Sequence, residues 1–115
     1  MSSYRNFNGT LSVSSGGVMS GASTITSQIF DTISYQEASF QPIWTGTPTG
    51  TFSVLVSNDA ENFSVLPTII STNPAGSAGN TMIPLYGFGA RYVQLSYTNS
   101  GGVGVLTVVA TGKTR

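Results

Sequence analysis

The chain has 115 residues, of which 39% are hydrophobic and 7% are charged, and its net charge is zero. Its four basic and four acidic residues are scattered, so no basic patch of the kind that binds nucleic acid or an anionic membrane is present. Cysteine and histidine are absent, which excludes a disulfide scaffold, thiolate or histidine catalysis and zinc sites built from those residues. A chain of this length forms one domain.

Residues 1–22 are polar and rich in glycine, and we interpret them as an N-terminal arm with one or two short strands. The arm could pack on its own domain or on a neighbouring subunit, and the sequence leaves both possibilities open. If the arm is an assembly device, its deletion should abolish assembly and leave the remaining domain, residues 23–115, folded.

Short alternating apolar runs, separated by clusters of Gly, Pro, Asn and Ser, follow the arm. Each run predicts a β-strand, because successive side chains of a strand point to opposite faces. The runs lie at residues 23–32, 33–45, 51–57, 62–70, 81–86, 90–98 and 103–111, with the clearest loop at 71–80. This spacing predicts an all-β fold, an antiparallel β-sandwich or jelly roll of about seven to eight strands.

Strand parity also predicts which side chains point inward. The expected core residues on the best-patterned strands are Ala38, Phe40, Pro42, Trp44, Phe52, Val54, Val56, Val93, Leu95 and Tyr97. Pro42 lacks a backbone N–H, which predicts an edge position or a bulge for its strand. The segments 44–59 and 90–111 each join two strands through a glycine-containing turn, and we interpret both as similar β-hairpins.

The acidic residues offer little chemistry. No spacing predicts a catalytic pair among the four carboxylates, so an enzyme is not expected; they are Asp31, Glu37, Asp59 and Glu61. The run 57–62 is rich in the oxygen ligands that calcium prefers, but we interpret it first as a polar turn capped by Asx side chains. No cofactor is predicted.

Three aromatic residues, Trp44, Tyr92 and Tyr97, are candidates for stacking on sugar rings. Strand parity favours the core for Trp44 and Tyr97. Arg91 could pair with an acidic group of a partner, although such an arginine is more often a solvated strand end.

Two stretches of sequence carry a family resemblance. WTGTPTGTFSVLVSND (44–59), with the Asn-Phe-Ser that follows, and ARYVQLSYTNSGGVGVLTVVATGK (90–113) resemble small β-sandwich modules of tailed-bacteriophage structural proteins. The resemblance covers about residues 35–113. The order of these motifs also resembles discoidin-like, galactose-binding jelly rolls, from which this chain departs at Ala60, Phe63 and Gln94.

The resemblance implies a non-enzymatic virion structural protein, above all a capsid decoration (cement) protein on the capsid surface, made in the host cytoplasm. The implied partners are the major capsid protein or other virion proteins, with a homo-oligomer in which a trimer is favoured, and without nucleic acid or membrane. The alternative is a carbohydrate-binding module, or a tail, neck or fibre component that adheres to host glycans. Partner contacts are expected from the arm and loop tips at Tyr4, Arg5, Phe7, Val18, Met19, Asn73, Pro74, Phe88 and Arg91.

Overall fold

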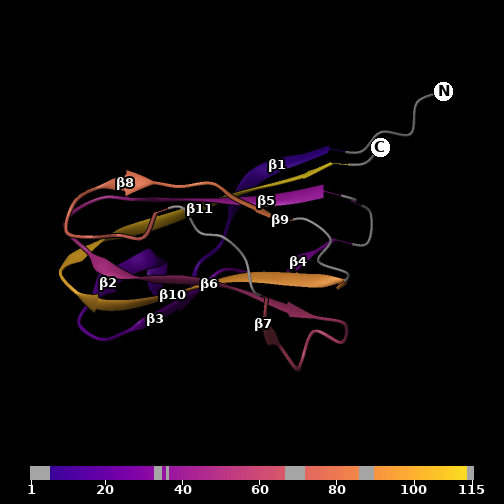
Figure 1. Ribbon diagram of the computed structural model, residues 1–115, viewed down its shortest axis with the longest axis horizontal. Helices are drawn as coiled ribbons and strands as arrows, with labels where there is room; N and C mark the ends of the chain where they lie inside the picture. The colour runs from indigo at the N-terminus through magenta and orange to yellow at the C-terminus, as the bar shows by residue number, and fades with distance from the viewer. Residues whose placement is uncertain (1–5, 33–34, 36, 67–71, 86–89, 114–115) are drawn as a thin grey trace.

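The computed structural model describes residues 6–32, 35, 37–66, 72–85 and 90–113, and they form two antiparallel sheets packed face to face (Figure 1). The predicted all-β antiparallel sandwich is confirmed. The first sheet contains β1 (Asn6–Leu11), β2 (Val18–Ser20), β5 (Glu37–Trp44), β8 (Gly79–Asn80), β9 (Ile83–Leu85) and β11 (Val103–Lys113). The second contains β3 (Thr24–Thr26), β4 (Phe30–Asp31), β6 (Thr49–Ser57), β7 (Ser64–Leu66) and β10 (Tyr92–Gly101).

One hydrophobic core lies between the two sheets. The side chains predicted to point inward on β5, β6 and β10 are buried there, except that Val56 is only half-buried. Aromatic rings pack together in this core: Trp44 of the first sheet and Phe52 of the second have ring centroids 5.6 Å apart, and Phe52 lies 4.9 Å from its neighbour Tyr97 in the same sheet. Burial of these large rings removes much apolar surface from water and is the main favourable contribution to folding.

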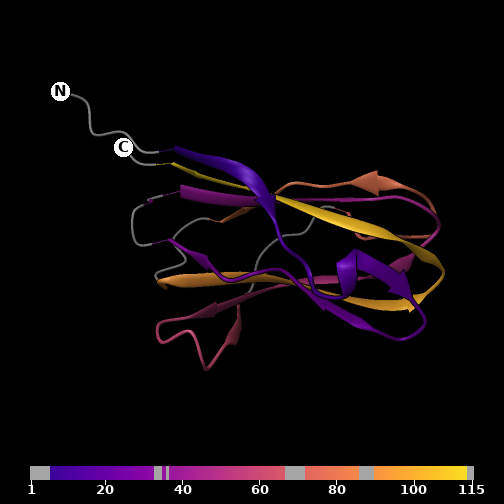
Figure 2. The same cartoon turned by 180° about the vertical axis from the view of Figure 1, so that it is seen from behind.

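The interpretation of two β-hairpins is wrong. β5 and β6 belong to different sheets, as do β10 and β11, whereas β6 pairs with β10 and β5 pairs with β11. Both connections are therefore corners that cross from one sheet to the other, and they lie at the same end of the molecule (Figures 1 and 2). Alternation along a strand reports which side chains face the core, but it does not report which strand lies alongside.

The two corners are hydrogen-bonded to each other. The N–H groups of Thr45 and Thr47 donate to the carbonyl oxygens of Val105 and Val103, at 3.0 and 2.8 Å. Gly102 has a φ of +73°, and a Cβ on it would collide with the carbonyl oxygen of Thr47. Only glycine combines this backbone conformation with so close an approach.

The buried Asn99 stabilises the corner between β10 and β11 through side-chain hydrogen bonds. The Asn99 side chain accepts a hydrogen bond from the Tyr97 hydroxyl at 2.8 Å and donates to the carbonyl oxygens of Gly21 and Gly102, at 2.8 and 3.3 Å. Asn99 also lies where the register between β6 and β10 shifts by one residue. Its side-chain amide thus satisfies the carbonyl oxygens of two glycines that lie just after strand ends, outside the β6–β10 ladder.

The expectation for Pro42 is also wrong, because β5 is an interior strand without a bulge at this residue. Pro42 lies opposite Val108 on one side, and on the other side its carbonyl oxygen accepts a hydrogen bond from the Thr81 N–H at 3.2 Å. The N–H and C=O groups of one residue in an antiparallel strand face the same side. The N–H that proline lacks would therefore have faced the break between β8 and β9. The interruption of the neighbouring strand therefore accommodates the proline.

The arm packs on its own domain over the residues that the structure describes. β1 pairs with β11 along its whole length, and β2 pairs with the other end of β11. Leu11 and Met19 are buried in the core, and Met19 has no exposed surface. Residues 6–20 are therefore packed as part of the sandwich, and we propose that the domain does not fold without residues 1–22.

Deletion of residues 1–22 should abolish folding. It removes β1, β2 and the buried side chains of Leu11 and Met19. Each of these side chains contributes about 2–5 kcal/mol, against a total stability of about 5–15 kcal/mol. Far-UV circular dichroism and the fluorescence of the buried Trp44 measure the result. Deletion of residues 1–5, which leaves β1 complete, is the control. A deletion protein with the unfolding midpoint of the full chain would contradict the expectation.

Substitution Asn99→Ala should lower the free energy of unfolding by about 2–3 kcal/mol, because the Tyr97 hydroxyl and the Gly21 carbonyl lose a buried partner. Urea denaturation measures this value. Ser100→Ala is the matched control: its exposed hydroxyl donates to the Thr49 carbonyl oxygen at 3.0 Å, and its loss should cost less than about 1 kcal/mol. Equal effects at the two positions would show that Asn99 does not fasten the corner.

Candidate interaction surfaces

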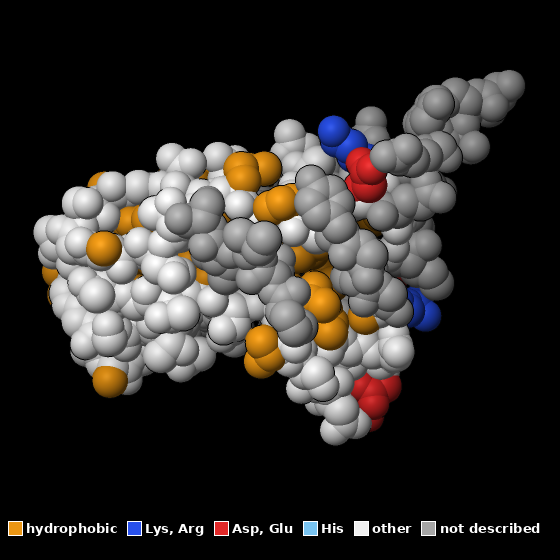
Figure 3. Space-filling view, viewed as in Figure 1, with side chains coloured by type: hydrophobic (Ala, Val, Ile, Leu, Met, Phe, Trp, Pro, Cys, Tyr) orange, Lys and Arg blue, Asp and Glu red, His pale blue; other side chains and the backbone are white. Residues whose placement is uncertain are grey.

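The charged side chains of the described residues gather at the end of the molecule opposite the corners. Charges flank strand ends at this end: Glu37 begins β5, Lys113 ends β11, and Arg91 precedes β10. Asp59 and Glu61 follow the end of β6. Figure 3 shows the red and blue side chains toward the right-hand end of the face in view. Long stretches without charge, such as residues 38–58 and 92–112, lead from this end to the corners.

Three valines are exposed near the corners on the outer face of the first sheet. Val18 of β2 lies directly opposite Val105 of β11, and Val103 is two residues along β11 on the same face. Their exposed fractions are 51% for Val18, 48% for Val105 and 60% for Val103. We call Val18, Val103 and Val105 the valine group. Strand parity fixes it, since Leu106 and Met19, which follow Val105 and Val18, point into the core.

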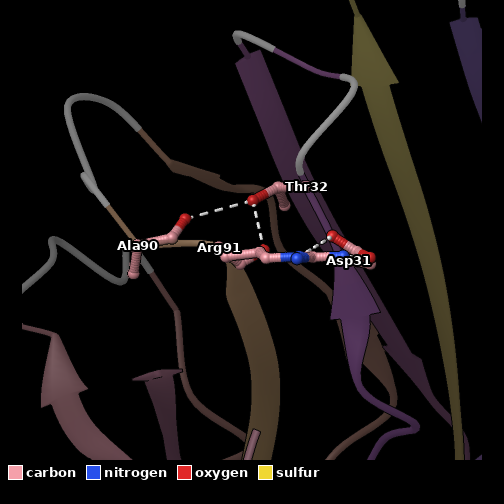
Figure 4. A network of polar contacts seen from close by, with 4 residues as sticks. All are labelled: Asp31, Thr32, Ala90 and Arg91. Atoms are coloured by element: carbon pink, nitrogen blue, oxygen red, sulfur yellow. Dashed lines mark hydrogen bonds and ion pairs between the residues drawn. The ribbon is translucent and has the colours of Figure 1, made fainter. Parts of the chain in front are cut away.

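Arg91 joins the start of β10 to the end of β4 at the charged end (Figure 4). Its Nε and Nη2 donate to the two carboxylate oxygens of Asp31, at 3.2 and 3.1 Å, and its guanidinium lies 5.0 Å from the centre of the Tyr92 ring. The Thr32 hydroxyl donates to the carbonyl oxygens of Ala90 and Arg91, which fixes the start of β10. Because the ion pair is about half-exposed, its contribution to stability is small.

Asp59 organises the turn after β6. Its carboxylate accepts hydrogen bonds from the N–H groups of Glu61 and Asn62 at 2.9 and 2.8 Å, from the Asn62 side chain at 2.8 Å and from the Ser57 hydroxyl at 2.7 Å. The hydrogen bonds from Asn62, followed by those from Glu61 and Ser57, hold the pKa of Asp59 well below its ordinary value. Its oxygens thus cap the turn, as the interpretation of a polar Asx turn expects. The described residues contain no group of three or more acidic side chains that could hold a metal ion.

The outer face of the first sheet has one shallow depression of about 200 Å³ among the described residues. It crosses β9, β5 and β11, with Glu37 and Lys113 at its rim and Met82 half-exposed beside it. Its polar lining residues are Glu37, Ser39, Thr111 and Lys113.

The aromatic residues proposed for sugar stacking are not available as a platform. Trp44 and Tyr97 are buried in the core, as strand parity predicted. The Trp44 indole N–H donates to the Ser77 carbonyl oxygen at 2.8 Å. Tyr92 is half-buried, and the Arg91 guanidinium covers its ring.

The predicted contact residues that the structure describes do not form a single surface. Tyr4, Arg5 and Phe88 lie outside the described residues. Met19 and Pro74 are buried, and Phe7 packs against Phe30 with ring centroids 5.3 Å apart. Asn73 is exposed, but its side-chain oxygen accepts a hydrogen bond from the Phe52 N–H. Val18 and Arg91 are exposed at opposite ends.

The sequence analysis did not identify two valines of the valine group, Val103 and Val105, as contact residues. Val103 and Val105 share the parity opposite to that of Leu106, Val108 and Ala110, which are buried. The available signal was an apolar residue at a strand position whose side chain faces solvent.

In the part of the chain that the structure describes, no helix is long and apolar enough to cross a membrane.

The Asp59 turn should make stability depend on pH. A carboxyl group whose pKa is lowered by folding stabilises the protein above its ordinary pKa, here 3.8, and this contribution is lost as the pH falls. Asp59→Ala should therefore destabilise the protein at pH 7, and the difference from the original chain should shrink at pH 3.

Urea denaturation at the two pH values measures the difference. Asp59→Asn is the control, because the amide side chain of asparagine keeps an acceptor oxygen but does not ionise. If Asp59→Ala lowers the free energy of unfolding equally at both pH values, the carboxylate does not have this role.

No protein-family model matches the chain, and no curated protein sequence is significantly similar to it. Solved structures do share its fold. The SPBc2 prophage-derived protein YomS matches with a TM-score of 0.59 and 11% identity, over 96% of both chains. The enzymatically active domain of bacteriophage CBA120 tailspike protein 4 matches with a TM-score of 0.50 and 14% identity, over 97% of this chain and 19% of that one. At these identities the likeness shows the fold alone: this sandwich occurs in phage-derived proteins.

Proposed function

We propose that the chain is a non-enzymatic structural protein of a bacteriophage particle, and that it acts through protein–protein contacts. The observation that carries the proposal is the uncharged end of the sandwich with the valine group exposed on it. The occurrence of the fold in phage-derived proteins supports the phage context.

An uncharged end suits a protein interface for a physical reason. Burying a charge without a partner costs much free energy, whereas the desolvation of a surface of Val, Thr and Ser costs little. The cores of interfaces are therefore depleted in charged residues. The two shorter dimensions of the molecule are 28 and 24 Å. An end of this size is of the same order as the ~800 Å² that each partner buries in a standard interface.

The finer proposal is a capsid decoration (cement) protein on the capsid surface, with the major capsid protein or another virion protein as its partner. A rigid sandwich with one apolar end and one charged end fits that role. The valine group would meet the shell, while the Arg91–Asp31 pair and the Asp59 turn stay in water. The chain is also proposed to form a homo-oligomer on the shell.

The proposal is tested on particles of the source phage. Mass spectrometry of purified particles should detect the chain, and added protein should co-sediment with particles from which it has been stripped. The double substitution Val103→Asp, Val105→Asp should weaken co-sedimentation at least about tenfold, because two charges would be buried in the interface.

Val65→Asp is the matched control. Val65 is 64% exposed on β7 of the second sheet, so the same change there should leave co-sedimentation intact. Absence of the chain from particles would refute the proposed function. Equal loss with both variants would refute the assignment of the valine group as the contact.

A second candidate is a tail, neck or fibre component that adheres to host glycans. The similarity of almost the whole chain to part of a tailspike domain favours it. The burial of Trp44 and Tyr97 argues against aromatic stacking on sugars. A glycan array probed with the assembled protein separates the two: specific binding there, with no co-sedimentation with capsids, would favour this candidate.

A further inference from the structure

The described strands that end a sheet differ in how far they are protected against pairing with another chain. β2, β3, β4, β7 and β8 are two or three residues long, and β9 contains Pro84. β1 is the exception: it has six residues, Asn-Phe-Asn-Gly-Thr-Leu, without a proline, a charge or a register shift. Natural sheet proteins guard such edges with short strands, lysine, proline or bulges. None of these devices is present on β1.

The register identifies the backbone groups on the free side of β1. Neighbouring residues of an antiparallel strand point their N–H and C=O groups to opposite sides. Val105 of β11 is bonded to Thr45 on the β5 side, so the even-numbered residues of β11 face β1. Gly9 and Leu11 lie opposite the even-numbered Ala110 and Val108. The backbone groups of Asn8 and Thr10 therefore point away from β11, toward the free edge.

We propose that the free edge of β1 binds a second copy of this chain, by antiparallel pairing of β1 with β1 about a two-fold axis. A strand edge is complementary to itself in this arrangement, so both copies satisfy their unpaired groups at once. The exposed side chains beside the edge, Asn8 and Thr10, are short and uncharged and allow close approach.

Electrostatics favours a second copy as the occupant. Lys113 lies at the Asn6 end of β1. Antiparallel pairing sends the two Lys113 side chains to opposite ends of the joined strands, where they do not repel each other. Each chain is also electrically neutral, so no net repulsion opposes the approach. This inference concerns the isolated chain and does not depend on a role in a phage particle.

The test measures self-association of the full chain by sedimentation velocity over a range of concentrations. A joined pair of six-residue strands forms an interface at the small end of the known range, so the dimer fraction should rise with concentration. Thr10→Pro removes only an N–H on the free edge, which an edge strand tolerates. It should weaken the dimer at least about tenfold and leave the urea unfolding curve of the monomer nearly unchanged.

Asn8→Lys is a second variant in case the proline perturbs β1, and it should weaken the dimer equally. Thr107→Lys is the control: Thr107 is exposed on β11 but lies inside the sheet, so the dimer should persist. A protein that is monomeric at every concentration overturns the proposal. So does a dimer that survives both edge variants, or a trimer that they do not affect.

Discussion

The fold depends on two corners that cross together from one sheet to the other. Because the N–H groups of Thr45 and Thr47 bond to β11, the β5–β6 corner cannot move without the β10–β11 corner. The corners thus fix how far apart the sheets lie and how the core side chains meet. Glycines at 102 and 104 permit this approach, since a Cβ at Gly104 would collide with the Thr45 carbonyl oxygen.

The corners also determine how the surface is divided. β5, β6, β10 and β11 all run between the corner end and the opposite end, so residues near their outer termini gather far from the corners. The described charges lie at or next to those termini, and Asp31 of β4 lies opposite Tyr92 at the start of β10. A chain that is neutral overall therefore has one end with the Arg91–Asp31 ion pair and further carboxylates, and another with Val, Thr, Ser and Gly.

Sequence patterns predict which side chains face the core far better than they predict strand pairing. The parity of β5 and β10 identified Phe40, Trp44 and Tyr97 as buried, because burial of one face leaves a direct trace in alternation. Pairing leaves no such trace, so two inter-sheet corners resemble two hairpins in sequence. The edge position predicted from Pro42 was wrong for a related reason. The break in the neighbouring strand that accommodates this proline lies between Asn80 and Ile83, far from Pro42 in the sequence.

The candidate surface was predicted only in part. Val18 was identified, but Met19, its neighbour, points inward and is buried. Val103 and Val105 could be found only by comparing both faces of β11. The proposed pairing edge at Asn8 and Thr10 could not be read from sequence at all, since an edge is a property of sheet order. Residue type alone is a poor guide to a surface that works through shape and lack of charge.

The uneven distribution of charge has a kinetic consequence. Oppositely charged surfaces attract one another across several ångströms of water, which raises association rate constants and makes them fall with added salt. An uncharged contact end provides no such steering. Encounters through it would proceed at the unassisted rate of about 10⁵–10⁶ M⁻¹ s⁻¹. The speed at which such a protein finds its place would then depend on its abundance, and hardly on the ionic strength of its surroundings.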